Sequence, residues 1–358
     1  MTVRIASGRV RVLGTGSALP GAPVGTQALL EKIERNFNIP THTGRALARR
    51  LGVQQRHIVR DFETRVESPR GGQRNPDLAT QAVQHAMSEA QLPVASLQYL
   101  FGHTATPARP LPPNVAEVAD QLNHTRPYLE LRQACTGFAS ALQLAMGLLG
   151  TAFADPIAIV GSETGSVFFD PLALLHDPGQ WVNLMQMGDG AGAIVLGPDA
   201  GAGEGAYVES AFVGHLGLGK KSGFTLEAGG SDFPALLPGC ATLTFSHDYA
   251  AVKSNGEMLF RAGLAAAQAA GVNLGSLAAI LPHQVNGRIG GWLARVFELP
   301  DSLFYGNAAS VGNLGSAAIW VALDALRRCG RLRSGDRVLV LGAEATQYLY
   351  GGFVYVHG

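Results

Sequence analysis

The sequence is poor in cysteine and in charged residues, and each scarcity excludes a class of protein. Only three cysteines, Cys135, Cys240 and Cys329, occur among 358 residues. A sparse and odd set of this kind does not form a disulfide framework, so we expect a reducing compartment such as the cytoplasm. Charged residues make up 15% of the chain against 47% hydrophobic residues, so much of it should be interior or subunit interface.

Long apolar runs and an excess of one charge are missing as well. No uncharged apolar run has the length of a membrane span, and the first residues lack the apolar core of a secretion signal. The 27 basic residues balance the 27 acidic ones, which gives no electrostatic reason to expect nucleic acid or a membrane as partner. We expect a cytoplasmic protein that binds neither, and we predict no metal site.

The order of strands and helices expected from the sequence repeats once along the chain. An apolar helix leads to an apolar strand that ends in Gly-small-Glu, and a glycine-rich strand follows. The pattern covers 138–149, 157–163 and 190–196, and again 316–326, 338–344 and 351–356. Coincidental similarity is the alternative, but the matched order favours a duplicated α/β unit with mixed, mostly parallel sheets. We place the two halves at 1–187 and 188–358.

Cys135 is the first candidate for chemistry, because it lies where an expected strand meets an expected helix. Unpaired N–H groups at the start of a helix favour an anion, so the position predicts a stabilised thiolate. The alternative is a buried structural cysteine, the more common fate of a lone cysteine.

Two polar residues of the C-terminal half are the candidate partners of this thiol. His283 ends an apolar strand, and Asn307 lies in a glycine-rich turn before a helix. Each has a structural alternative, since the chain has ten histidines and Gly-Asn is common in turns. Catalytic groups of duplicated α/β folds gather at the carboxyl ends of strands, so we expect the three side chains to meet there.

Together these segments resemble the β-ketoacyl synthase III family of the thiolase superfamily. The resemblance covers nearly the whole chain and rests on five motifs in a fixed order. They are Arg-Leu-Gly-Val (50–53), Ala-Cys-Thr-Gly-Phe (134–138), Met-Gly-Asp-Gly-Ala-Gly-Ala (187–193), His-Gln-Val-Asn (283–286) and Tyr-Gly-Asn (305–307). It implies a thiolase-like fold with a layered α-β-α-β-α core and a homodimer.

The resemblance also implies a mechanism. Cys135 is acylated by an acyl thioester, and its own N–H forms part of an oxyanion hole. His283 and Asn307 then donate hydrogen bonds to the thioester carbonyl of a malonyl or β-ketoacyl group, which loses carbon dioxide and forms a carbon–carbon bond, with or without cyclisation. Both substrates are bound to acyl carrier protein or coenzyme A, and no further cofactor is expected. Substrate contacts are implied at Arg50, Leu111, Asn286 and Asn255.

Three segments depart from the family pattern. Ala46 stands where the family usually has a tryptophan that stacks on coenzyme A, which predicts a preference for carrier-protein substrates. Leu111 stands in a dimer loop where a phenylalanine usually enters the partner's acyl pocket, which predicts a longer or branched acyl chain. The apolar segment 167–175, with Trp181, is expected to form a dimer interface or a pocket wall. These departures favour a specialised enzyme of secondary metabolism.

The C-terminal motif departs most, because Gly342–Gln347 replaces the family's run of glycines. Glu344 within it is either a structural counterpart of Glu163 or an additional base for deprotonation or ring closure, and Glu163 is a candidate for the same role.

Three other functions fit part of the pattern. A cysteine protease would also use Cys, His and Asn, but the tryptophan-containing motif of papain-type enzymes is missing and the duplication stays unexplained. The same Cys-His pair would serve an acyltransferase that acts on an alcohol or amine without decarboxylation, against which the retained Asn307 argues. A non-catalytic partner subunit of a heterodimeric synthase is the third, against which the intact Cys135, His283 and Asn307 argue.

Overall fold

A long first strand, β1 (Val3–Ala18), links two layers of sheet. Its first part pairs with β8 (Tyr207–His215) and its second part with β7 (Gly190–Pro198), both antiparallel. The computed structural model describes residues 3–65, 67, 69, 73–150, 155–199, 201, 205–227 and 244–358, so Cys240 lies outside the described residues. The nine strands run β11-β12-β13-β8-β1-β7-β6-β4-β5.

The predicted repeat is present in the order and pairing of the elements. In the first unit β1 is followed by α3 (Asn75–Glu89), β4 (Tyr99–His103), α5 (Gly137–Leu149), β6 (Ile157–Glu163) and β7. In the second unit β8 is followed by α7 (Tyr249–Ala269), β11 (Leu277–Pro282), α10 (Ala318–Arg328), β12 (Arg337–Glu344) and β13 (Leu349–Val356). β4 and β6 are parallel, as are β11 and β12, and the other pairs among these strands are antiparallel. The sheets are therefore mixed as predicted, but the predicted excess of parallel pairs is wrong.

The first unit is longer than the sequence analysis predicted. β7 pairs with both β6 and β1, so this unit extends to Pro198, past the division placed between residues 187 and 188. It also carries an extra edge strand, β5 (Tyr128–Leu131), which is parallel to β4.

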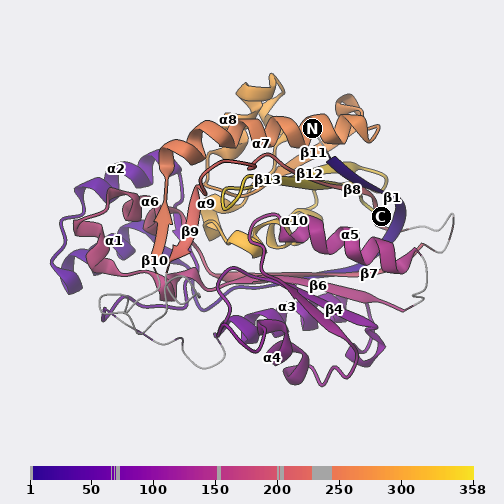
Figure 1. Ribbon diagram of the computed structural model, residues 1–358, viewed down its shortest axis with the longest axis horizontal. Helices are drawn as coiled ribbons and strands as arrows, with labels where there is room; N and C mark the ends of the chain where they lie inside the picture. The colour runs from indigo at the N-terminus through magenta and orange to yellow at the C-terminus, as the bar shows by residue number, and fades with distance from the viewer. Residues whose placement is uncertain are drawn as a thin grey trace.

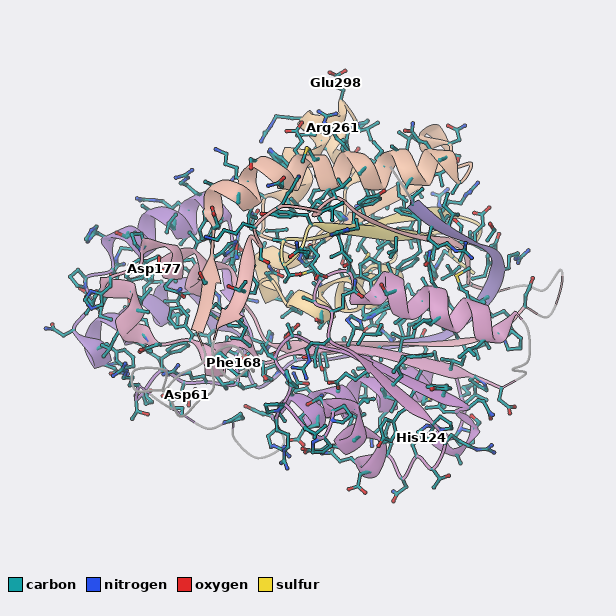
Figure 2. The ribbon with its side chains drawn as sticks, in the orientation of Figure 1. Asp61, His124, Phe168, Asp177, Arg261 and Glu298 are labelled. Carbon is teal, nitrogen blue, oxygen red and sulfur yellow. The ribbon has the colours of Figure 1, made fainter. Side chains whose placement is uncertain are left out.

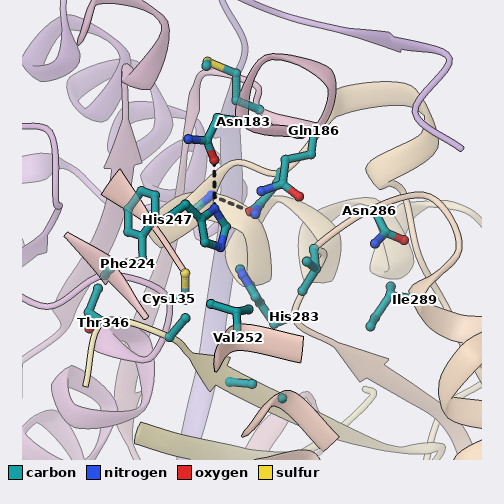
Figure 3. Close-up of a pocket in the computed structure, with 18 of the residues that line it drawn as sticks. Cys135, Asn183, Gln186, Phe224, His247, Val252, His283, Asn286, Ile289 and Thr346 are labelled. Carbon is teal, nitrogen blue, oxygen red and sulfur yellow. Dashed lines mark hydrogen bonds between the residues drawn. The ribbon is translucent and has the colours of Figure 1, made fainter. Parts of the chain in front are cut away.

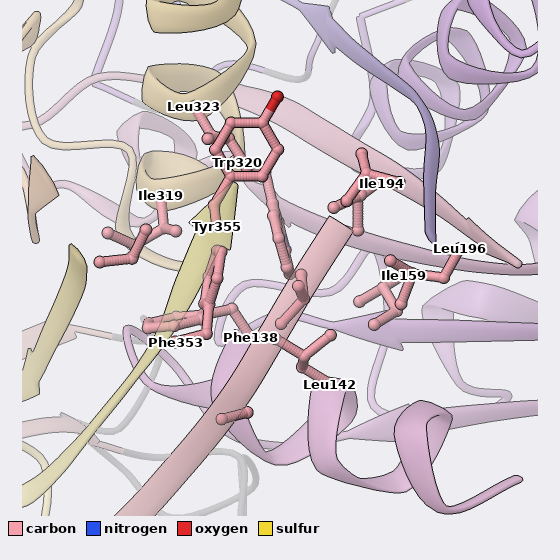
Figure 4. Packing of buried hydrophobic residues seen from close by; sticks show 14 of the residues in the cluster. Phe138, Leu142, Ile159, Ile194, Leu196, Ile319, Trp320, Leu323, Phe353 and Tyr355 are labelled. Atoms are coloured by element: carbon pink, nitrogen blue, oxygen red, sulfur yellow. The ribbon is translucent and has the colours of Figure 1, made fainter. Parts of the chain in front are cut away.

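The layers alternate as α-β-α-β-α, which is the predicted architecture (Figure 1). Helices α5 and α10 lie between the sheet layers, with α7 and α8 (Ile289–Phe297) on one outside and α3 and α4 (Asn114–Gln121) on the other. Alternation along each strand produces this order: in β6, Ile157 and Ile159 join the central cluster, whereas Ala158 and Val160 face α3. Phe138 meets both Trp320 and Phe353 edge to face within the central cluster (Figure 4).

Shorter elements lie beside the two units. They are β2 (Val24–Gly25), α1 (Thr26–Phe37), α2 (His42–Leu51), β3 (Gln55–Arg56), α6 (Pro178–Gln186), the antiparallel pair β9 (Phe224–Glu227) and β10 (Thr244–His247), and α9 (Ala308–Val311). Trp181 is buried against α1 and α2 together with Phe169 and Leu174, so these three side chains form interior packing within the chain. The sequence analysis predicted that the segment 167–175, with Trp181, forms a dimer interface or a pocket wall, and neither role applies to these three side chains. Leu175 of the same segment is exposed.

Some of the charged side chains lie on the outside of the molecule. Figure 2 shows Arg261 on the outer face of α7 and Glu298 beyond the end of α8. Arg261 pairs with Glu257 one turn away on the same helix, at 2.8 Å. Over the residues that the structure describes, no helix is long and apolar enough to cross a membrane.

Candidate active site

Cys135 and His283 come from different units and line the same cavity, which has a volume of about 690 Å³. Cys135 immediately precedes Thr136, the N-cap of α5, and His283 follows the last residue of β11. Arg50, Glu163 and Asn286 line this cavity too, as predicted. Figure 3 shows Cys135 and His283 side by side in it.

The predicted stabilised thiolate is wrong. Burial raises the pKa of the Cys135 thiol well above its ordinary value, and the nearby carboxylates of Glu344 and Glu163 raise it further. The start of α5 is already engaged by a carboxylate, because Glu344 Oε2 accepts hydrogen bonds from the Thr136 N–H at 2.9 Å and from its hydroxyl at 2.7 Å. The thiol therefore keeps its proton near neutral pH and needs a base before it can attack.

His283 is suited to accept that proton. Its backbone N–H donates to the carbonyl of Leu341 at 2.7 Å, which ties the end of β11 to β12. Burial lowers the pKa of the imidazole to about 4, so the ring is neutral near pH 7. Its Nδ1 is buried and has no hydrogen-bond partner among the residues described.

The asparagine predicted to join them, Asn307, does not line the cavity. Asn307 caps α9 and donates its backbone N–H to Gln284 Oε1 at 2.9 Å, but it is not among the residues that line the cavity. Asn313 lines it instead, and its Oδ1 accepts the N–H of Gly315 at 3.0 Å, which leaves the amide NH₂ as the donor. The signal was a second Gly-Asn pair in the same segment, at 312–313.

Two further predicted substrate contacts do not reach the cavity within this chain. Asn255 is engaged elsewhere: its Oδ1 accepts from Lys220 Nζ at 2.6 Å and its NH₂ donates to the Ala251 carbonyl at 2.8 Å. Leu111 lies in the loop between β4 and α4 with 82% of its surface exposed. Its predicted place in a partner's pocket stays a prediction.

Comparison with known proteins shows the family of this chain. The family model for 3-oxoacyl-[acyl-carrier-protein (ACP)] synthase III matches residues 129–214, and the model for its C-terminal part matches residues 267–354. β-Ketoacyl-[acyl-carrier-protein] synthase III 3 of Streptomyces coelicolor is 31% identical over 339 residues, which cover 91% of each chain. The chain belongs to the β-ketoacyl-[acyl-carrier-protein] synthase III family. It is a ketosynthase III-like condensing enzyme and an acyltransferase.

Other relatives of this ketosynthase extend the comparison. Acetoacetyl CoA synthase NphT7 of a Streptomyces species, strain CL190, is 28% identical over 344 residues, 93% of this chain and 94% of that one. Among solved structures, AbyA1, described as a tetronic acid condensing enzyme, is 28% identical with a TM-score of 0.83 over 97% of this chain and 99% of that one. The 3-oxoacyl-(acyl carrier protein) synthase III of Pseudomonas aeruginosa PAO1 is 26% identical with a TM-score of 0.79 over 98% of both chains.

The ketosynthase cavity has a basic rim that the sequence analysis largely missed. The basic residues that line it are Arg288 at the N-cap of α8, Arg295 on α8, Lys253 on α7 and Arg50 on α2. Trp292 of α8 lines it as well, edge to face with Phe260 at 6.3 Å. Trp292 therefore places an indole ring at the cavity, whereas Ala46, which stands at the position of the family's usual tryptophan, is an exposed residue of α2. The apolar face of 289–297 was the available signal.

The two glutamates proposed as additional bases are already occupied. Glu163 accepts hydrogen bonds from the N–H of Ala105, from the Thr106 hydroxyl, and from both the N–H and the hydroxyl of Ser316. Glu344 accepts from Thr136 and Thr346 and does not line the cavity. These contacts favour a positioning role for both carboxylates, because a substrate proton would have to displace an existing donor.

The β9–β10 pair forms a wall of the cavity that the sequence analysis did not anticipate. Phe224 and Phe245 stack with their ring centroids 5.1 Å apart, and His247 follows on β10. Asn183 and Gln186 of α6 line the cavity beside them. Within the described part of the chain, no group of three or more His, Cys, Asp or Glu side chains is placed to hold a metal ion.

Proposed function

We propose that this ketosynthase III-like enzyme transfers an acyl group from a carrier-bound thioester to Cys135 and joins it to a malonyl or β-ketoacyl thioester. The observation that carries the proposal is that Cys135, His283 and Asn313, from three separate segments, line one cavity. A thiol, a neutral imidazole and an amide donor are the groups that acyl transfer and enolate stabilisation require.

Acylation begins when the Cys135 sulfur attacks the thioester carbonyl. The thiol proton passes to the neutral His283, and from there to the thiol that leaves with the carrier. The high pKa of Cys135 and the low pKa of His283 keep both groups uncharged before the step. The Cys135 N–H remains a candidate donor to the oxyanion.

Condensation follows when the second thioester replaces the first carrier. When it is a malonyl thioester, its carboxylate leaves as carbon dioxide, and the electron pair forms an enolate whose oxygen accepts hydrogen bonds from Asn313 and His283. The enolate carbon attacks the acyl carbonyl, and the Cys135 sulfur leaves and regains a proton. A β-ketoacyl thioester has no carboxylate to lose, so its α-proton passes to the neutral His283 to form the enolate, and His283 returns that proton to the leaving Cys135 sulfur. The product then has the functional groups for a subsequent ring closure.

The basic rim supports substrates that carry a phosphopantetheine arm. Arg50, Lys253, Arg288 and Arg295 surround the opening with positive charge, which attracts phosphate groups. Ala46 offers no aromatic face to adenine, so we expect carrier-protein substrates to be preferred over coenzyme A. Kinetics with matched acyl-carrier and acyl-coenzyme A substrates test this preference, and equal or faster reaction with coenzyme A contradicts it.

The homodimer belongs to this proposal. Leu111 is 82% exposed, and the edge strand β5 has exposed Tyr128 and Leu129, so both segments have surface for a second copy to cover. Light scattering should report twice the chain mass, and a monomer at micromolar concentration would contradict it.

The deciding experiment is incubation with a panel of acyl thioesters plus a malonyl thioester. We expect an acyl adduct on Cys135, release of carbon dioxide and a condensed product, all measured by mass spectrometry. An adduct that moves to an alcohol or amine without carbon dioxide would support the acyltransferase alternative. No adduct with any thioester would support the non-catalytic subunit and contradict the proposal.

A further inference from the structure

A second histidine, His247 on β10, lines the cavity and has no role in the mechanism proposed above. Contacts with three side chains fix the orientation of its ring. Its Nδ1 lies 2.9 Å from Asn183 Oδ1. The ring stacks on Tyr249, with centroids 3.9 Å apart, and stands perpendicular to Phe224 at 5.2 Å. Its Nε2 is buried and has no hydrogen-bond partner among the residues described.

The surrounding amides determine which nitrogen of His247 carries the proton. Gln180 Nε2 donates to Asp177 Oδ2 at 2.9 Å and to the Phe245 carbonyl at 2.6 Å, and neither of these oxygens can donate. Gln180 Oε1 must therefore face Asn183, whose NH₂ it accepts at 3.2 Å. That orientation directs Asn183 Oδ1 towards His247, so the proton is on Nδ1.

Nε2 is consequently a hydrogen-bond acceptor. Burial lowers the pKa of His247 to about 4, so the ring is neutral near pH 7 and Nε2 carries a lone pair. Buried polar atoms are nearly always paired in folded proteins, and a ligand that supplies the missing partner gains a contact that the free protein lacks. The ligand group that fits is a hydrogen-bond donor.

The position of His247 assigns this donor to the acyl chain. In Figure 3, Asn286 and Ile289 lie on one side of Cys135 and His283, Phe224 lies on the other, and His247 lies between Phe224 and His283. Ile289 belongs to α8, the helix that also carries Arg295 of the basic rim. A carrier arm that enters past α8 and presents its thioester to Cys135 directs the acyl chain towards the hairpin.

We propose that His247 Nε2 accepts a hydrogen bond from a hydroxyl group on the acyl chain that Cys135 receives, so that the enzyme selects hydroxylated acyl thioesters. The inference rests on the proposed acylation of Cys135. A cationic amine fits poorly, because Phe224 and Phe245 provide apolar surroundings and the Glu163 carboxylate is already occupied. Asn183 and Gln180 are positioning residues that act through His247.

The test compares acyl thioesters of equal length with a hydroxyl group at successive carbons or with none. The rate of Cys135 acylation is measured by intact-mass spectrometry for each substrate. For the best hydroxylated substrate we expect a preference over the unsubstituted one of about tenfold to a few hundredfold. His247→Phe should bring this ratio to about one, because a ring of similar shape remains without an acceptor.

Three variants separate recognition from structural damage. His247→Gln keeps an acceptor near the position of Nε2 and should restore part of the preference. Asn183→Leu should weaken the preference, because the ring loses the partner that holds its tautomer. Tyr249→Phe keeps the stacked ring and should retain the preference, since the Tyr249 hydroxyl lies at 3.4 Å from Asn183.

Two outcomes would overturn the inference alone. One is equal acylation by the hydroxylated and unsubstituted thioesters at every position. The other is a His247→Phe variant that lowers both rates by the same factor, which a purely structural role predicts. A preference for chains with an amide N–H and none for hydroxyl groups would also contradict it. The absence of any Cys135 adduct would overturn the proposed function together with this inference.

Discussion

In each repeated unit one strand ends in a glutamate that accepts hydrogen bonds from the start of a central helix, but the residue beside that helix start differs between the two units. Glu163 ends β6 and accepts the N–H of Ser316 at 3.2 Å, at the start of the helical segment that leads into α10. Glu344 ends β12 and accepts the N–H of Thr136 at 2.9 Å, at the start of α5. Each carboxylate thus caps the N-terminus of the central helix of the other unit. Negative charge is stabilising at that position because the helix dipole is positive there.

The two helix starts differ in the residue that precedes Thr136 or Ser316. Cys135 precedes Thr136, whereas Gly315 precedes Ser316 with a φ of +51°. A Cβ at position 315 would lie 2.9 Å from Glu163 Cγ, so glycine is favoured there by both conformation and space. Duplication made two equivalent helix starts, but one of them carries the nucleophile and the other has no side chain.

Substitution of Cys135 and of Gly315 by alanine should show the largest difference in activity between the two units. Cys135→Ala should remove acylation and lower condensation by at least about a thousandfold, because the covalent step is lost. Gly315→Ala should retain the Cys135 adduct but lower the free energy of unfolding by about 1–3 kcal/mol through backbone strain. Intact mass and urea unfolding measure the two effects. An acyl adduct on the alanine variant at position 135 would refute the assignment.

The two Gly-Asn pairs of the second unit should differ nearly as much. Asn313→Ala should lower condensation by about a hundredfold to a thousandfold, since an enolate donor is lost, while the Cys135 adduct still forms. Asn307→Ala should change the rate by less than about threefold, because this residue does not line the cavity. Carbon dioxide release and adduct mass distinguish the steps. The opposite ranking would return the role to Asn307.

The caps should also affect the thiol unequally. Both carboxylates raise the pKa of Cys135, Glu344 more than Glu163, so the wild-type alkylation rate should keep rising with pH beyond the ordinary thiol range of about 8.5. Glu344→Gln keeps an acceptor for Thr136 and removes the charge, so its pKa falls and alkylation near pH 8 accelerates by about threefold to tenfold. Glu163→Gln should show a smaller increase. Identical pH profiles for all three proteins would contradict the electrostatic account.

The hydroxyl groups of the two caps should show the smallest effect. Thr136→Val and Ser316→Ala each remove one hydroxyl donor to a buried carboxylate while the backbone N–H contact remains. Each should lower the free energy of unfolding by about 1–2 kcal/mol, measured by urea denaturation. A loss at one cap and none at the other would show that the two are not equivalent.

Local pattern was enough to predict much of this architecture. Alternating apolar strands and the repeated Gly-small-Glu ending predicted the duplicated fold, because each feature depends on neighbours a few residues away. The same holds for Cys135 before α5 and His283 after β11, which are defined by the ends of their own elements.

By itself, then, the sequence determined the duplicated α/β fold and the positions of Cys135 and His283 at the ends of their own elements. The tertiary structure decided the features that depend on contacts between residues far apart in the sequence. Gly312, with a φ of +80°, turns the chain after α9, and Asn313 rather than Asn307 lines the cavity. Glu344 lies 208 residues from Thr136 and occupies the helix start that sequence reasoning reserved for a thiolate. His247 acquires its tautomer from side chains of α6. Hydrogen bonds and charges act over distances in space, and no local spacing in the chain encodes those distances.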